Sequence, residues 1–251
     1  MVEWGVLIVA AFLAGVLNTI AGGGTFLTFP ALVFAGLPPV AANATSAVAV
    51  LPGYLSGTLG FSKELKAFDR KQLLRLTIWT VIGGLMGAIL LMISSNKAFS
   101  GIVPFPLLAA TLIFVFSDKF GDMGHEKNAR SIVPFGITGL VIVTIYGGYF
   151  NGGLGIVLLA LFALWGMTDI HQMNGLKNGL YFALSMISVV AFAVGGLVAW
   201  PQAVVMMGAA TLEGYEGAPI ARDLPRAAVR WVVIVVGFGM SAIFLARLIG
   251  G

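Results

Sequence analysis

Cysteine is absent from the chain, and charged residues and histidines are scarce. The lack of cysteine excludes disulfides, iron–sulfur clusters and thiol chemistry. Two histidines give little basis for a haem or metal site, so we expect no cofactor. No hydrolase, phosphate-loop or metal-binding signature is present either, and we expect no enzyme activity. Only 10% of the residues are charged, whereas soluble domains carry about a quarter, so we expect no separate soluble domain.

Apolar sequence is what the chain has in abundance. Hydrophobic residues make up 59% of the 251 positions and the mean hydropathy is +1.01. This composition predicts one all-α, multi-pass membrane domain over residues 1–251. Glu3 stands where a secretory signal would need positive charge, so we expect the first apolar segment to be retained. The net charge of +4 is expected on cytoplasmic loops and not on a nucleic-acid surface.

Hydrophobic runs between helix breakers predict the membrane segments. A helix needs roughly 20 residues to cross a hydrocarbon core about 30 Å thick. Two of the runs, 25–36 and 154–166, are too short to cross alone. The predicted segments lie near 4–20, 25–36, 43–61, 73–94, 101–117, 131–150, 154–166, 173–194, 200–213 and 227–249.

The two short runs occupy corresponding places in the two halves of the chain. A shift of 130 positions lays Gly22, Gly23 and Gly36 over Gly152, Gly153 and Gly166. Each half reads as a long run, a glycine break, a short run, a turn and three further spans. This order predicts a duplicated fold. The expected parts are one repeat at about 4–117, a linker at about 118–130 and a second repeat at about 131–250.

The distribution of basic residues predicts that the repeats are inverted. The stretch 195–202 contains no basic residue. The corresponding loop 62–75 contains five: Lys63, Lys66, Arg70, Lys71 and Arg75. Lys and Arg concentrate in short cytoplasmic loops, so the two stretches should face opposite sides. The linker is then cytoplasmic and both termini lie outside. Charge does not decide whether the segment 4–36 is a re-entrant hairpin or crosses the membrane twice.

The glycine breaks at Gly22 to Gly24 and at Asn151 to Gly153 are the first candidate site residues. Broken backbone in lipid persists only where protein buries it or water wets it. Helices restarting at Thr25 and at Leu154 would aim their N–H groups at an anion, and paired breaks of this kind mark transporter binding sites. The alternative is close helix packing by small residues, which suits glycines inside one smooth run: Gly83, Gly84 and Gly87.

Polar residues follow each short run and complete the candidate site. They are Asn43, Thr45 and Ser46 in the first half and Asn174, Lys177 and Asn178 in the second. A lysine within a membrane span indicates function, although its amine could instead snorkel to the interface. The first three residues could equally cap a helix start. For Asp169 and His171 we weigh proton coupling against a solvated turn.

Two long stretches resemble the TauE/SafE sulfite exporter family, also called the 4-toluene sulfonate uptake permeases. They are AGGGTFLTFPALVFAGLPPVAANATSAVAVLPGYLSG in the first half and YGGYFNGGLGIVLLALFALWGMTDIHQMNGLKNG in the second. The ending GAPIARDLPRAAVRWVVIVVGFGMSAIFLARL is similar too, so the resemblance covers nearly the whole chain.

The resemblance implies a permease of the bacterial inner membrane for sulfite or an organosulfonate. The expected partners are the small anionic substrate and the lipid bilayer, and no nucleic acid. The resemblance also implies that the glycine breaks and the polar residues after them match the family's two repeats. Alternating access is the expected mechanism. An anion channel, a uniporter and a carrier of small carboxylates stay open as alternatives, as do the oligomeric state and the coupling ion.

Overall fold

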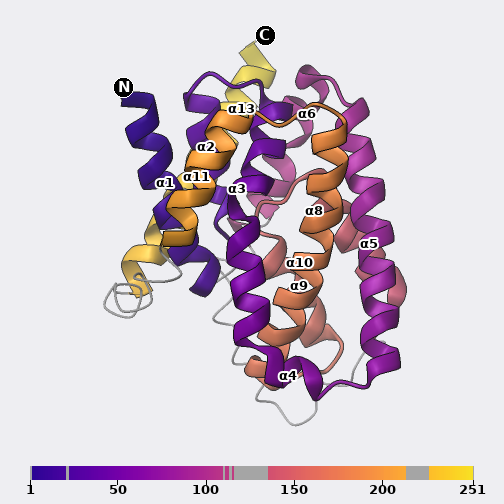
Figure 1. Ribbon diagram of the computed structural model, residues 1–251. Coiled ribbons are helices and arrows are strands. Elements are labelled where there is room, and N and C mark those ends of the chain that lie inside the picture. Colours follow the sequence, from indigo (N-terminus) through magenta and orange to yellow (C-terminus); the bar gives the residue numbers. More distant parts are fainter. Residues whose placement is uncertain are drawn as a thin grey trace.

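The computed structural model describes residues 2–20, 23–109, 111–112, 115, 135–212 and 226–250, which are helical with short turns and no strand among them. The helices lie side by side in a bundle, with both chain termini at one end and α4 at the other (Figure 1). They are α1 (Val2–Ile20), α2 (Thr25–Phe34), α3 (Pro39–Gly60), α4 (Ser62–Lys66), α5 (Arg70–Ile93), α6 (Asn96–Ile102), α8 (Ile137–Tyr149), α9 (Leu154–Leu164), α10 (Ile170–Val194), α11 (Trp200–Leu212) and α13 (Arg226–Gly250). The expected linker 118–130 lies outside the described residues.

Most helices match the predicted apolar segments, but two of the helices differ. The helix α6 starts before the segment predicted at 101–117 and ends near its beginning, and α3 starts earlier than predicted. This helix begins at Pro39 and not at residue 43. Proline suits the first helical position because its fixed φ is helical and its missing N–H would be unbonded there in any case. Asn43, Thr45 and Ser46 therefore lie inside the helix, and the capping interpretation of these three residues is wrong.

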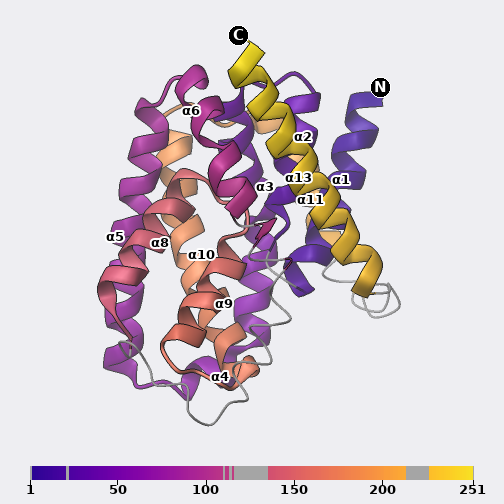
Figure 2. The same cartoon turned by 180° about the vertical axis from the view of Figure 1, so that it is seen from behind.

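Two helix pairs fold back on themselves, and we call them hairpin 1 (α1 and α2) and hairpin 2 (α8 and α9). Hairpin 1 opens toward the end that holds the termini, and hairpin 2 opens toward the opposite end, which the view from behind also shows (Figure 2). The helices α8 and α9 have 13 and 11 residues. At about 1.5 Å per residue both are shorter than a hydrocarbon core of about 30 Å. Hairpin 2 thus has the dimensions of a re-entrant hairpin.

The short return helices α2 and α9 end in the same turn. Gly36 and Gly166 both take positive φ angles, of 88° and 82°. In both turns the next residue donates its N–H to the carbonyl five positions back, Leu37 to Leu32 and Met167 to Phe162. Glycine suits this left-handed position because it has no Cβ to clash. These pairs are 130 positions apart, which is the shift expected from the sequence.

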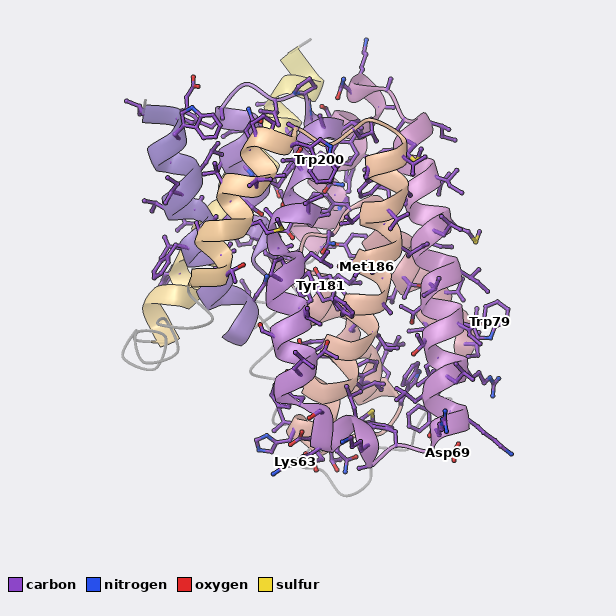
Figure 3. The ribbon with its side chains drawn as sticks, viewed as in Figure 1. Lys63, Asp69, Trp79, Tyr181, Met186 and Trp200 are labelled. Carbon is purple, nitrogen blue, oxygen red and sulfur yellow. The ribbon has the colours of Figure 1, made fainter. Side chains whose placement is uncertain are left out.

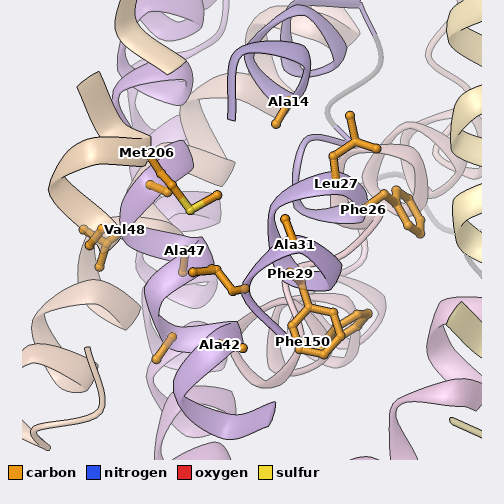
Figure 4. Packing of buried hydrophobic residues seen from close by; sticks show 14 of the residues in the cluster. Ala14, Phe26, Leu27, Phe29, Ala31, Ala42, Ala47, Val48, Phe150 and Met206 are labelled. Carbon is orange, nitrogen blue, oxygen red and sulfur yellow. The ribbon is translucent and has the colours of Figure 1, made fainter. Parts of the chain in front are cut away.

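Small residues let the helices approach closely in the interior of the bundle. The helix α5 packs parallel to α8, and a Cβ added at Gly87 would clash with the backbone at Ile145 and Tyr149. The helix α3 is central and contacts α1, α2, α10 and α11. Four of its alanines are fully buried: Ala42, Ala44, Ala47 and Ala49. Ala42 and Ala47 lie in the same core cluster as Phe29 of α2 and Phe150 of hairpin 2 (Figure 4).

The outer surface of the bundle is apolar along the length of α5. Ile78, Ile82 and Ile89 are 39% to 49% exposed, and Trp79 points away from the bundle (Figure 3). Among the described residues, α5 and α10 are long and apolar enough to cross a membrane by length and composition. A surface of this kind is suited to lipid, because monomeric soluble proteins rarely expose large apolar patches.

We predict that Gly87→Ala destabilises the bundle, because its new Cβ would lie 2.6 Å from the backbone nitrogen of Tyr149. Overpacking of this kind costs about 1–3 kcal/mol. The matched control is Gly208→Ala on α11, where a Cβ meets nothing within 4 Å. Thermal unfolding in detergent should show a lower apparent Tm for Gly87→Ala alone. Equal Tm values for the two variants would mean that α5 and α8 are not in close contact.

Candidate functional site

The tip of hairpin 1 is held by one asparagine of α1. The Oδ1 atom of Asn18 accepts a hydrogen bond of 2.8 Å from the backbone N–H of Gly24. Asn18 is 7% exposed, and a Cβ at Gly24 would lie 2.8 Å from its amide. The absence of a side chain at Gly24 is therefore what brings the break against α1. This bond assigns Oδ1 of the amide to the Gly24 N–H, and Nδ2 lies close to the place where a Cβ of Gly24 would be.

The tip of hairpin 2 is held by two tyrosines. The hydroxyl of Tyr146 donates to the carbonyl of Gly152, and the hydroxyl of Tyr181 on α10 contacts both oxygens of Asn151, the carbonyl at 2.7 Å. Gly153 takes a left-handed φ of 74° immediately before α9. A residue with a Cβ would be strained at that φ, so glycine is required there by the turn itself.

The two hairpins meet around α3. The ring of Phe29 on α2 packs edge-on against Phe150 at the tip of hairpin 2, with centroids 5.6 Å apart. Asn43 on α3 donates a hydrogen bond of 3.0 Å to the carbonyl of Tyr149. These contacts join α2 and α3 of the first half of the chain to the tip of hairpin 2 in the second half.

A stacked pair of tyrosines crosses the same region. Tyr54 on α3 and Tyr181 on α10 stack with ring centroids 3.9 Å apart and planes 20° from parallel. The side chain of Thr25, the first residue of α2, lies beside the hydroxyls of both rings, and Asn18 lies beside that of Tyr54. Groups from hairpin 1, α3 and α10 thus surround one buried point.

Four hydrogen-bond donors at this point make no hydrogen bond of acceptable geometry to a described residue, although those of Asn18 and Thr25 lie beside that of Tyr54. They are Nδ2 of Asn18, Oγ1 of Thr25, the hydroxyl of Tyr54 and Nδ2 of Asn151. All four side chains are more than nine-tenths buried. An unsatisfied buried polar group costs about 1–3 kcal/mol, so four in one place indicate groups arranged for an acceptor. We call this set the tip donors.

The backbone contributes less than the sequence predicts. The N–H groups of Phe26 and Leu27 bond the carbonyls three residues earlier, and that of Ile156 does the same in hairpin 2. Together with the Gly24 N–H held by Asn18, most of the N–H groups expected to face an anion are already satisfied. What remains available at the tips is chiefly side-chain donors, with the helix dipoles of α2 and α9 behind them.

The remaining predicted residues of the first half have local partners. Thr45 accepts a hydrogen bond from the backbone N–H of Ala199, which ties α3 to the turn before α11. Ser46 pairs with the hydroxyl of Thr28 at 2.5 Å and so anchors α2 to α3. Gly23 accepts the N–H of Phe26, and Gly22 lies outside the described residues.

The predicted residues of α10 lie about one to two helical turns before Tyr181, on the α4 side of the hairpin tips. Lys177 is 1% exposed, and its Nζ donates a hydrogen bond of 2.8 Å to Oδ1 of Asn174. The side chain of Asn178 packs against Gly57, where a Cβ would crowd it. The backbone carbonyl of Asn178 accepts a hydrogen bond from the hydroxyl of Thr58. Helical side chains lean toward the helix N-terminus, so Lys177 extends away from the hairpin tips. Its amine does not snorkel out of the bundle.

Neither proton-coupling candidate lies near the hairpin tips. Oδ1 of Asp169 accepts hydrogen bonds from the N–H groups of His171 and Gln172 and caps the start of α10. His171 is exposed at the same end of the helix. Within the described ranges no group of three His, Cys, Asp or Glu residues could hold a metal ion.

An apolar helical bundle with two opposed broken hairpins that meet around buried polar groups is the architecture of a membrane transporter. The chain belongs to the sulfite exporter TauE/SafE family, whose model matches residues 7–244. The family and its relatives are membrane transporters and not enzymes.

Three relatives align over nearly the full chain and carry the name of transporter. The "Probable membrane transporter protein" of Haemophilus influenzae is 29% identical over 238 residues, which cover 94% of this chain and 92% of the relative. The "Probable membrane transporter protein ORF9" of Sinorhizobium is 26% identical, with coverage of 96% and 91%. YfcA of Escherichia coli K12, a "Probable membrane transporter protein", is 28% identical, with coverage of 95% and 88%. No solved structure matches the chain significantly.

Four residues of the site were missed from the sequence: Asn18, Tyr54, Tyr146 and Tyr181. Asn18 is a polar residue inside the first apolar run, which is a signal that could have been used because polar groups within membrane spans are costly. Tyr54 and Tyr181 gave no such signal. Tyrosine is common at membrane interfaces, and only the crossing of α3 and α10 reveals that these two rings stack at the middle of the bundle.

We predict that Gly24→Ala disrupts the tip of hairpin 1, since its Cβ would lie 2.6 Å from the carbonyl oxygen of Ala14. The matched control is Gly53→Ala on α3, which faces the same Asn18 amide at an ordinary 3.6 Å. Gly24→Ala should lower both the apparent Tm and substrate transport, and Gly53→Ala should keep both. Wild-type behaviour of Gly24→Ala would contradict the close approach of the break to α1.

Proposed function

We propose that the protein transports a small sulfur-containing anion, such as sulfite or an organosulfonate, by alternating access at the meeting point of the two hairpins. The observation that carries the proposal is the set of tip donors. Asn18, Thr25 and Tyr54 come from the first half and Asn151 from the second. An anion with several oxygens can accept from all of them at once. The sulfur chemistry rests on the family, and the anionic character rests on the donors.

Neutral donors suit a carrier that must also release its ligand. Each hydrogen bond to a charged group contributes about 1.5–3 kcal/mol net, so a few donors can bind an anion without holding it permanently. The positive ends of the α2 and α9 dipoles add to the attraction because both helices begin at the tips. The substrate site in this proposal comprises the tip donors and the breaks themselves, Gly23, Gly24, Gly152 and Gly153.

The proposed mechanism uses two inverted repeats, one in about 4–117 and the other in about 131–250. Three observations support it: the hairpins open to opposite ends, their return helices end in matching turns 130 positions apart, and Phe29 of hairpin 1 packs against Phe150 at the tip of hairpin 2. Rocking of one repeat against the other would expose the tip donors first to one side of the membrane and then to the other.

The same proposal gives the orientation in the bacterial inner membrane. Lys63 and Lys66 on α4, with Arg70 and Lys71 at the start of α5, gather at the end opposite the termini. Because basic residues favour the cytoplasmic side, α4 faces the cytoplasm and both termini face outward. Hairpin 2 then opens to the cytoplasm and hairpin 1 to the outside.

We predict that Asn18→Asp and Asn151→Asp each lower kcat/KM for anion flux at least tenfold. Aspartate keeps the oxygen that accepts from Gly24 or from Tyr181 but replaces the donor with an acceptor. The matched control is Asn96→Asp, because Oδ1 of Asn96 also accepts a backbone N–H, that of Val40 at 3.0 Å, away from the tips. Asn96→Asp should transport like the wild type.

The measurement is uptake into proteoliposomes of a panel that contains sulfite, methanesulfonate, taurine and acetate. Saturable flux of the sulfur anions in the wild type supports the proposal, and saturable flux of acetate alone replaces it with a carboxylate carrier. Single-channel currents in voltage-clamped bilayers would replace the carrier with an anion channel. Equal flux in Asn18→Asp, Asn151→Asp and Asn96→Asp would remove the tip donors from the substrate site.

A further inference from the structure

One face of α10 carries a continuous row of polar side chains through the bundle. Its members follow one another at spacings of three and four residues, so they lie on one side of the helix. All but Asn174 are buried. We call this row the α10 stripe: Asn174, Lys177, Tyr181, Ser185 and Ser188.

Lys177 in this stripe is a buried amine that has no counter-charge among the described residues. Its one hydrogen bond goes to the neutral amide of Asn174, and no described carboxylate forms an ion pair with it. A buried charge is normally paired because removing it from water costs several kcal/mol. The part of the chain that the structure describes thus provides no anion for Lys177, and an oxyanion substrate could supply one.

The two serines of the stripe differ from several other hydroxyl residues of the described helices. Ser and Thr in apolar helices can bond the carbonyl one turn earlier, as Thr111 does to Leu107 and Ser241 does to Gly237. The hydroxyls of Ser185 and Ser188 bond neither that carbonyl nor any other described atom. Buried hydroxyls without partners indicate groups available to a passing polar ligand.

The stripe runs past the tip donors and is divided there by the tyrosine stack. Tyr181 lies near mid-height in the bundle, with Lys63 at one end and Trp200 at the other (Figure 3). Lys177 lies on the α4 side of Tyr181, and Ser185 and Ser188 lie on the side of the chain termini. Because Tyr54 stacks on Tyr181 at 3.9 Å, the two sides are separated at this level.

We propose that the α10 stripe is the wall of the translocation pathway, and that the Tyr54–Tyr181 stack is the barrier across it. Lys177 with Asn174 forms a second position for the small oxyanion between the barrier and the α4 end. Ser185 and Ser188 line the route between the barrier and the other end. This assignment rests on the proposed transport function and adds to it the route and the order of positions along it.

The chain has no cysteine, so single cysteines can report which face of α10 meets water. Ser185→Cys and Ser188→Cys are nearly isosteric and should react with a membrane-impermeant methanethiosulfonate in proteoliposomes. Methanesulfonate in saturating amounts should slow the reaction at least fivefold. The control is Met186→Cys, which replaces a side chain 41% exposed on the outer side of the same helix and should stay unreactive.

The barrier is tested in the same assay by adding Tyr54→Ala to Ser185→Cys. The reaction with reagent supplied from the α4 side should become at least tenfold faster, whereas Tyr54→Phe, which keeps the stacked ring, should leave the rate unchanged. Unreactive Ser185→Cys and Ser188→Cys, or equal reactivity at Met186→Cys, would overturn the pathway. An unchanged rate in the Tyr54→Ala variant would overturn the barrier.

For the second position we predict that Lys177→Met lowers the maximal flux of methanesulfonate at least tenfold. Equilibrium binding of methanesulfonate to the purified protein should change less than threefold, because the tip donors are intact. Lys177→Arg keeps the charge and should recover part of the flux. The control is Lys63→Met, which removes the same charge from an exposed position on α4 and should not alter flux.

The outcomes separate this inference from the proposed function. Absence of saturable flux in the wild type would contradict both the proposed transport function and the pathway that rests on it. Wild-type flux that persists unchanged in Lys177→Met would remove the second position alone. Loss of binding together with flux in Lys177→Met would place the lysine in the central site and contradict an ordered pair of positions.

Discussion

Hydrogen bonding of interrupted backbone inside an apolar bundle is the constraint on which the structure depends. Each glycine break exposes amide and carbonyl groups that lipid cannot satisfy. Side chains from neighbouring helices supply the missing partners: Asn18 accepts from Gly24, Tyr146 donates to Gly152, and Tyr181 donates to Asn151. The groups that stabilise the breaks are therefore also the groups gathered at the candidate site.

This constraint explains why α3 and α10 occupy the centre. Each follows a hairpin in sequence, and each contributes one ring to the Tyr54–Tyr181 stack between the tips. The alanines of α3 and the close contact of Gly87 with α8 allow the helices to approach within reach of side-chain hydrogen bonds. Small residues at the helix contacts thus bring the helices close together. The buried polar groups at the tips then lie near enough to form hydrogen bonds with neighbouring helices.

The sequence predicts the helices, the two breaks and their meeting because these depend on local signals and on duplication. The length of an apolar run, the glycines of the breaks and the Pro38–Pro39 pair each determine the conformation of the backbone near them. Side-chain partners were harder to foresee because they join residues far apart in the chain. The position of Thr45 after the first short run predicts that it binds substrate, but its hydroxyl accepts a hydrogen bond from the N–H of Ala199. The sequence does not predict Tyr54 as a site residue, but its ring stacks on that of Tyr181. The register between α3 and α10 decides both, and no local pattern encodes it.

The placement of the only charged group of the α10 stripe has a consequence for turnover. A lysine among the tip donors would form a buried ion pair with the anion, and breaking such a pair costs about 3–5 kcal/mol. Lys177 instead lies one turn beyond the tyrosine stack and is directed toward the α4 end. Its charge can attract an anion along the bundle while the neutral donors of Asn18 and Asn151 hold it at the centre. Because the lysine that attracts the anion is separate from the donors that bind it, neither interaction is too strong to reverse. A carrier requires this because it must bind its substrate on one side of the membrane and release it on the other.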